Sequence, residues 1–446
     1  MYTVVIILLD CGEPYLSGFV RSTRSICPAC FRRLPALIVR RGNEYFLEKT
    51  CPEHGVYSVV VWRGDEPSYE DWGAGCPPIA QLSDDGDPDC YNDCGLCPAH
   101  LQKTCCALVE VTHRCDLHCT VCFAETGISS IDPPVDKLYE QFRQLVSEGN
   151  TFVQLSGGEP TTRGDLAEIV AAAKEAGCEN IQLNSNGILL GKDKTLAKSL
   201  CKAGLSFVFM QFDGTEDTIY EKLRGGPALL EKKAAIDNCA DALLGVTLVP
   251  TLVPGVNDHN IGNIIDFGLS NSPAVRGVHF QPISYFGRYP GAPDNRGRIT
   301  LPEVLREIEA QTGGKLRISD FAPSRCDHPY CGFHGDFAVL PKKKLLKLTP
   351  KNREQCCGDA HIKNRNFVAR RWKRTAESER GCCDGGDYSD MDSFVSRIKS
   401  HGFTITAMAF QDAYTLDLER LRRCSLHVSE DGKMIPFCAK YISREC

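Results

Sequence analysis

The sequence has no excess of positive charge and no long hydrophobic run. It holds 51 lysines and arginines against 57 acidic residues, a formal net charge of −6, so we expect no broad nucleic-acid-binding face. The apolar stretch at residues 1–9 is too short to span a membrane and lacks the basic flank of a secretory signal. These absences predict a cytoplasmic protein without a transmembrane segment.

Cysteine, by contrast, is unusually abundant, with 25 copies among 446 residues. Disulfides in such number would require an oxidising compartment, and the missing signal argues against one. We therefore interpret the cysteines mainly as metal ligands in a reducing compartment. Hydrophobic residues at 42% and charged residues at 24% are typical of a globular protein, and the length allows two or three domains.

The most informative stretch is a C-x3-C-x2-C run formed by Cys115, Cys119 and Cys122, directly after an apolar, strand-like segment at 107–112. Three thiolates can hold three irons of a 4Fe–4S cluster and leave the fourth iron without a protein ligand. Such an open iron can bind a small molecule. The alternative is that the three cysteines form part of a zinc site.

A second motif, Gly157-Gly158-Glu159-Pro160, ends the next apolar run, just after Ser156. Two glycines let a backbone approach a ligand closely. Glu159 or nearby exposed carbonyls can accept hydrogen bonds from an ammonium group. The plainer interpretation is a turn at the end of a strand.

Together the two motifs resemble those of the radical S-adenosylmethionine (radical SAM) superfamily. The resemblance implies that SAM chelates the open iron and that one electron cleaves it to methionine and a 5′-deoxyadenosyl radical. It also implies that Gly157, Gly158 and Glu159 position the amino group of SAM. Phe123 and Ser156, which adjoin the two motifs, are expected at the same site.

From residue 107 to about 282, apolar strand-like runs alternate with amphipathic segments. This pattern predicts an α/β fold with a parallel sheet covered by helices, and six such units match the partial (β/α)6 barrel that the resemblance implies. The expected strands are 107–112, 152–155, 180–183, 207–212, 245–252 and 277–281, and the expected helices include 135–148, 165–176, 229–243 and 302–311.

Polar residues follow several of these strands, where ligands gather in parallel α/β folds. They are Asn184, Asn186, Gln211, Asp213 and Gln281. We expect them to converge on one cavity, with Asn184, Asn186 and Gln211 facing the carboxylate or the ribose of SAM. Taken singly, each Asn-Gly or Asp-Gly pair is more often a turn.

Three arginines lie near the same strand ends: Arg224, Arg276 and Arg288. They could bind a carboxylate or phosphate of the substrate. A role as solvated loop cations is at least as well supported.

Near the start of the chain, Cys27-Pro-Ala-Cys30 and Cys51 predict a metal site in a small β-hairpin module. The fourth ligand is His54 or Cys76. Four such ligands would form a closed tetrahedral site for iron or zinc, and the ion would help a module with little core to fold.

Two further cysteine groups predict auxiliary centres. Cys90, Cys94 and Cys97 repeat the C-x3-C-x2-C spacing, with Cys105 or Cys106 as a fourth ligand and zinc as the alternative to a second 4Fe–4S cluster. Towards the end of the chain, Cys326, Cys331, Cys424 and Cys438 are the best candidates for a further cluster. The vicinal pairs Cys356-Cys357 and Cys382-Cys383 favour thiol chemistry.

These groups define the expected domains. They are an extension (1–20), a rubredoxin- or zinc-ribbon-like module (21–75), an auxiliary iron–sulfur segment (76–106), the core barrel (107–318) and a C-terminal auxiliary-cluster domain (319–446). The combined motifs resemble the radical SAM (seleno)protein group called TrsS and, more distantly, the archaeal tetraether lipid synthase, which joins lipid chains through carbon–carbon bonds.

The resemblance implies a radical SAM oxidoreductase or transferase that draws electrons from an external low-potential donor such as flavodoxin or ferredoxin. Auxiliary centres are useful when a radical product must gain or lose an electron. They therefore favour carbon–carbon or carbon–sulfur bond formation, or peptide maturation. The alternative is a non-catalytic iron–sulfur or zinc protein that carries electrons or binds a partner.

Overall fold

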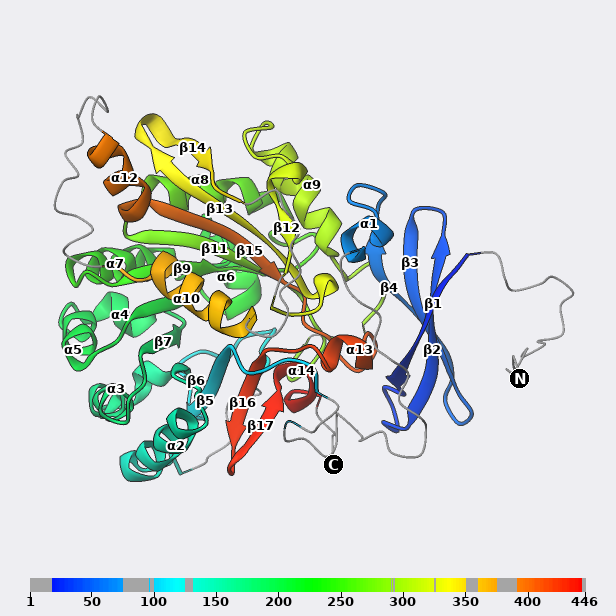
Figure 1. Ribbon diagram of the computed structural model, residues 1–446, viewed down its shortest axis with the longest axis horizontal. Helices are drawn as coiled ribbons and strands as arrows, with labels where there is room; N and C mark the ends of the chain where they lie inside the picture. Colours follow the sequence, from blue (N-terminus) through cyan, green and yellow to red (C-terminus); the bar gives the residue numbers. More distant parts are fainter. Residues whose placement is uncertain are drawn as a thin grey trace, which may run out of the picture.

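The computed structural model describes residues 18–74, 96, 100–124, 131–289, 291, 293–324, 326–349, 360–374 and 391–442 (Figure 1). The predicted ligands Cys76, Cys90, Cys94 and Cys97 lie outside these ranges, as do the pairs Cys356-Cys357 and Cys382-Cys383. Within the described ranges, the helices are too short or too polar to cross a bilayer.

The N-terminal module is an antiparallel sheet of four strands in chain order. The strands are β1 (Phe19–Ile26), β2 (Arg33–Arg41), β3 (Glu44–Cys51) and β4 (Gly55–Arg63), followed by α1 (Tyr69–Gly73). Along β3, Tyr45 and Leu47 are buried while their neighbours are less so, as expected of a sheet with one face on a core. That core includes Trp62 and Trp72, and Figure 1 shows the module beside the main body.

The central sheet contains six parallel strands that neighbour one another in chain order. They are β5 (Cys106–Thr112), β6 (Phe152–Gly157), β7 (Asn180–Ser185), β8 (Phe207–Gln211), β9 (Gly245–Val249) and β11 (Val275–Pro282). β6 is buried along its whole length, as is typical of a strand inside a parallel sheet. The predicted parallel α/β sheet is therefore confirmed.

The helices that follow these strands along the chain include several that the apolar periodicity predicts. The main ones are α2 (Val135–Ser147), α3 (Leu166–Glu175), α5 (Leu196–Ala203), α7 (Leu229–Asp241), α8 (Ile261–Ser270) and α9 (Leu301–Gln311). Shorter elements complete this part of the chain: α4 (Ile188–Lys192), α6 (Asp217–Arg224) and β10 (Thr251–Leu252), which pairs with β11.

The C-terminal part extends the central sheet at both edges. β15 (Gly402–Met408) pairs parallel with β11, and β16 (Leu426–Glu430) pairs parallel with β5. The remaining strands are β12 (Ala322–Pro323), β13 (Gly332–Leu340), β14 (Lys344–Lys347) and β17 (Lys433–Pro436), and the helices are α10 (Ala360–Trp372), α12 (Met391–Ser400), α13 (Leu418–Leu421) and α14 (Phe437–Lys440). The segment after residue 319 thus shares its main sheet with the core.

Arg276 connects these C-terminal helices to the sheet. Its side chain is buried in β11, where Nε donates to the carbonyl of Arg371 at 2.7 Å and Nη1 donates to the carbonyl of Ser400. Arg371 belongs to α10 and Ser400 ends α12. Arg276 is therefore a buried structural residue, which excludes its interpretation as a solvated loop cation.

Replacing Arg276 with methionine should destabilise the protein. Methionine replaces the apolar stem of arginine but not its guanidinium, so the two buried carbonyls lose their donor. We expect the free energy of unfolding to fall by about 3 kcal/mol. The thermal unfolding midpoint of anaerobically reconstituted protein should fall by several degrees. Arg296→Met, at an exposed position, is the matched control, and equal midpoints for the two variants would contradict the assigned role.

Candidate active site

The Gly-Gly-Glu motif is hydrogen-bonded to the backbone that leads into the cysteine run. The amide of Gly158 donates to the carbonyl of Thr112 at 2.8 Å, and that of Glu159 donates to the carbonyl of Arg114 at 2.8 Å. Gly157 has a φ of +114°, and a Cβ on Gly158 would lie 2.1 Å from the Arg114 carbonyl oxygen. Both positions therefore require glycine, and the contact holds the motif against the start of the cysteine loop.

The Glu159 carboxylate joins the ends of β6 and β7. It is 1% exposed and accepts hydrogen bonds from the Thr161 hydroxyl at 2.6 Å, the Ser185 hydroxyl at 2.9 Å, and the amides of Thr161 and Asn186. Burial raises the pKa of Glu159, although these donors oppose the change. The role of Glu159 at the amino group of SAM stays a prediction.

A buried ion pair fixes the far side of the cysteine loop. The Arg224 guanidinium donates to both oxygens of Asp213 at 2.7 Å and to the carbonyl of Val121 at 3.0 Å. Burial opposes the charge on Arg224, but the Asp213 carboxylate raises its pKa above the ordinary value. Arg224 is thus not a solvated cation.

Arg288 holds the same loop from a different segment. Its Nη1 donates to the Cys119 carbonyl at 3.1 Å, and its backbone exchanges hydrogen bonds of 2.9 Å with Cys122. The loop is therefore fixed on two sides by arginines.

The three cysteines of the run face one cavity. Cys119 is buried, and Cys115 and Cys122 are half-buried. Burial raises the pKa of the Cys115 thiol to about 12 and raises that of Cys119 as well. Thiolates here would need a cation beside them, so three thiols that line one cavity fit an iron–sulfur cluster better than they fit free cysteines.

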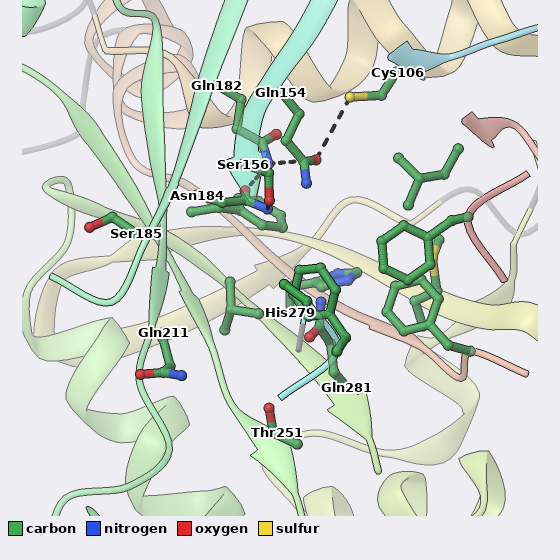
Figure 2. Close-up of a pocket in the computed structure, with 18 of the residues that line it drawn as sticks. Cys106, Gln154, Ser156, Gln182, Asn184, Ser185, Gln211, Thr251, His279 and Gln281 are labelled. Carbon is green, nitrogen blue, oxygen red and sulfur yellow. Dashed lines mark hydrogen bonds between the residues drawn. The ribbon is translucent and has the colours of Figure 1, made fainter. Parts of the chain in front are cut away.

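The cavity has a volume of about 290 Å³ and is lined from several strands of the central sheet (Figure 2). β6 and β11 are not neighbours, yet both contribute, so the sheet curves around it. Most of the residues expected at the cofactor site lie on its wall: Phe123, Ser156, Gly157, Gly158, Glu159, Asn184, Asn186, Gln211 and Gln281. Asp213 is not part of that wall and instead holds Arg224.

Several wall residues escaped the sequence analysis. Gln154, Gln182, Phe209, His279 and Trp372 all line the cavity. Gln154 and Ser156 are two residues apart on β6, as are Gln182 and Asn184 on β7, so each pair lies on one face of its strand. Polar residues at a spacing of two within apolar strands were the sequence signal that could have identified them. Trp372 gave no such signal, because it reaches the cavity from α10, far along the chain.

The N-terminal module brings four predicted ligands together. The ligand atoms of Cys27, Cys30, Cys51 and His54 all lie within 4.8 Å of one another, and the Cys30 and Cys51 sulfurs are 3.8 Å apart. Tetrahedral zinc with Zn–S bonds of about 2.3 Å places two thiolates roughly 3.8 Å apart. His54 thus resolves the choice of fourth ligand among the described residues, and the geometry fits one ion.

Those predicted auxiliary ligands that the structure describes fall into two groups. Cys105 contacts Cys326, and this contact, with burial, raises the pKa of Cys326 well above its ordinary value. Cys331, Cys424 and Cys438 lie close enough to act on one another electrostatically. Cys105, expected with the upstream cysteines, therefore lies beside a C-terminal one. Auxiliary clusters at these groups stay a prediction.

Comparisons with known proteins agree with this arrangement. Residues 109–268 match the family described as Radical SAM superfamily, and residues 19–63 match the HMPTM N-terminal zinc ribbon domain. A 7,8-dihydro-6-hydroxymethylpterin dimethyltransferase from Methanocaldococcus jannaschii is 32% identical over 470 residues, covering 94% of this chain and 92% of that protein. The chain belongs to the radical SAM superfamily. Within this superfamily, the chain belongs to the same family as the Methanocaldococcus protein. Its chemistry uses a 4Fe–4S cluster and SAM.

Other radical SAM relatives match a smaller part of the chain. Fe-coproporphyrin III synthase from Methanosarcina barkeri is 30% identical over 256 residues, covering 54% of this chain and 59% of that protein. GTP 3′,8-cyclase from Limosilactobacillus fermentum is 28% identical over 186 residues, covering 39% and 54%. These two relatives match about half of the chain or less, whereas the Methanocaldococcus protein matches 94% of it.

Replacing Gly158 with alanine should displace the cysteine loop. The new Cβ would overlap the Arg114 carbonyl, and misplacement of a catalytic group by about 1 Å costs about a hundredfold in rate. We expect this loss in 5′-deoxyadenosine formation, with less iron retained. Gly164→Ala is the matched control because nothing lies within 4 Å of its added Cβ. Equal loss in both variants would contradict a specific role for Gly158.

Replacing Cys51 with serine should remove the ion of the N-terminal module. Total metal should fall by about one ion per chain, and hydrogen exchange at 19–63 should accelerate because this small sheet loses its cross-link. Cys201→Ser, at a half-buried position in α5, is the control. An unchanged metal content in Cys51→Ser would exclude the predicted site.

Proposed function

We propose that this radical SAM enzyme forms a carbon–carbon bond by placing a methyl group on a carbon of a pterin-type ring. The observation that carries the proposal is the similarity to the pterin dimethyltransferase, which spans both the zinc-ribbon module and the core. It falls within the predicted class of bond-forming transferases.

When bound, the cluster and SAM would supply a 5′-deoxyadenosyl radical that takes a hydrogen atom from an unactivated C–H bond of the substrate. The methyl group would come from a methyl-carrying donor, which leaves as the demethylated donor, and one electron from the external reductant would complete the new carbon–carbon bond. The chain's own residues hold and orient the reactants. Cys115, Cys119 and Cys122 ligate the cluster, and the Gly157–Glu159 backbone faces the amino group of SAM. The amides of Asn184, Asn186, Gln211 and Gln281 face its carboxylate and ribose.

The remaining metal sites have separate roles in this proposal. The ion held by Cys27, Cys30, Cys51 and His54 has four protein ligands and is structural, as closed zinc sites are. The buried C-terminal cysteines hold auxiliary iron–sulfur centres. Such centres would pass on the electron that completes the new bond, and an external donor such as flavodoxin or ferredoxin would reduce the protein.

A second candidate is the joining of hydrocarbon chains, the reaction class of the tetraether lipid synthase that the sequence resembles. It is favoured by apolar side chains on the cavity wall, among them Phe152, Val368 and Phe437. The likeness to the TrsS group, carbon–sulfur bond formation and peptide maturation stay predictions.

The deciding experiment uses anaerobically reconstituted protein with SAM and dithionite. Adding 6-hydroxymethyl-7,8-dihydropterin should stimulate 5′-deoxyadenosine formation several-fold, and a methylated pterin should appear by mass spectrometry when reducing cell extract supplies the methyl donor. A Cys115/Cys119/Cys122→Ala variant should form no deoxyadenosine while keeping its other iron.

The other outcomes discriminate among the alternatives. Stimulation by an ether lipid and not by the pterin would favour the joining of hydrocarbon chains. Absence of deoxyadenosine under every condition, with more than four irons bound, would favour a non-catalytic electron carrier. Bound zinc without labile sulfide would contradict the assignment of the cysteine run.

A further inference from the structure

Below the strand ends, the cavity wall contains a second layer of polar side chains. Side chains two residues apart on a strand share a face, so Ser156, Gln154 and Phe152 on β6 reach successive depths. Gln154 and Gln182 are register partners on β6 and β7, and both line the cavity. Ser156 and Asn184 lie nearer the cysteine run, so these two glutamines occupy the next layer down.

The two glutamines are held in a fixed orientation. Nε2 of Gln182 donates to Oε1 of Gln154 and to Oδ1 of Asn184, both at 2.9 Å. This arrangement leaves Nε2 of Gln154 and Oε1 of Gln182 without a hydrogen-bond partner in the described part of the chain. The residues are only 9% and 2% exposed, and Figure 2 shows the two amides together at the cavity. Both residues line the cavity, so this donor and this acceptor lie side by side and are available to a ligand with a complementary edge.

Aromatic rings from other elements continue the wall at this depth. The ring of Phe209 lies 4.7 Å from that of Trp372 and 5.4 Å from that of His279, measured between centroids. Burial lowers the pKa of His279 to about 4, so the ring is neutral near pH 7. Its Nδ1 is hydrogen-bonded to the Thr406 hydroxyl at 2.8 Å, which leaves Nε2 for another partner.

Helix α10 closes the cavity at the end away from the cysteine run. Asn364, Val368 and Trp372 are spaced by four, lie on one helix face and line the cavity. The Trp372 indole donates to the Thr404 hydroxyl at 2.8 Å. A Cβ on Gly245, at the start of β9, would lie 1.9 Å from the Trp372 carbonyl oxygen, so the helix packs directly against the strand.

We infer that Gln154, Gln182 and His279 form a subsite for a flat heteroaromatic ring with an amide-like edge, and that Phe209 and Trp372 stack against the ring. The inference rests on the proposed function and locates its substrate. A lactam edge supplies both an acceptor for Gln154 and an N–H donor for Gln182. A hydrocarbon chain would leave these amides unpaired and would therefore bind more weakly than a ring with a matching polar edge.

The test is calorimetric binding of 6-hydroxymethyl-7,8-dihydropterin to reconstituted, SAM-loaded protein. Gln154→Leu and Gln182→Leu should each weaken binding by about tenfold, the value of one hydrogen bond. The affinity of Gln154→Leu for SAM should stay unchanged, whereas Gln182→Leu also removes the donor to Asn184. Gln154→Glu, which keeps size and polarity but loses the donor, should also weaken binding. Gln144→Leu on the exposed face of α2 is the control.

The outcomes separate the subsite from the reaction. Weakened pterin binding in both leucine variants, without methylated product from the wild type, would support the subsite and overturn the methyl transfer. Methylation by the wild type with unchanged pterin affinity in these variants would overturn the subsite alone. Wild-type protein that binds an ether lipid and no pterin, or neither molecule, would overturn the subsite.

Discussion

Two short backbone hydrogen bonds, from Gly158 to Thr112 and from Glu159 to Arg114, join the end of β6 to the start of the cysteine loop. They form only because Gly157 and Gly158 carry no Cβ, since a Cβ at either position would overlap the opposing backbone. The loop itself has almost no regular structure, so its shape depends on such external contacts. Arg224 and Arg288 supply two more, and both reach backbone carbonyls within the loop. The orientation of three thiols thus depends on residues scattered over nearly 180 positions of the chain.

The C-terminal region completes the cavity that this loop opens onto. β15 and β16 extend the sheet at opposite edges, and α10 closes the cavity opposite the cysteines. Arg276 holds α10 and α12 in place. The C-terminal part of the chain, which also contains Cys326, Cys331, Cys424 and Cys438, therefore helps to shape the cavity.

The N-terminal module is attached to the same C-terminal region. Lys49 is buried and donates to the carbonyls of Ala413 and Tyr414 at 2.8 and 2.9 Å. Arg21 pairs with Asp417, which also accepts from the Thr23 hydroxyl at 2.6 Å. Buried charged contacts of this kind require accurate geometry, and an ion held by the four N-terminal ligands would fix the geometry of this small sheet. The metal site is thereby linked to the position of residues 413–417 and, through them, to the rest of the C-terminal part.

Local patterns in the sequence predict the chemistry class and the central strands. These patterns are properties of residues that are neighbours in the sequence, so they can be recognised without knowing the fold. They are the thiol spacing in the cysteine run, the glycines at the end of β6, and the alternating periodicity of strands and helices. The same holds for the ligands Cys27, Cys30 and Cys51. The choice of His54 as their partner needed the distances. Only the tertiary structure decided that Arg224 and Arg276 are buried structural residues, and that Gln154, Gln182 and Trp372 meet at one cavity. Their positions depend on strand register, sheet curvature and the packing of a helix from far along the chain, and no local sequence pattern encodes contacts over such separations.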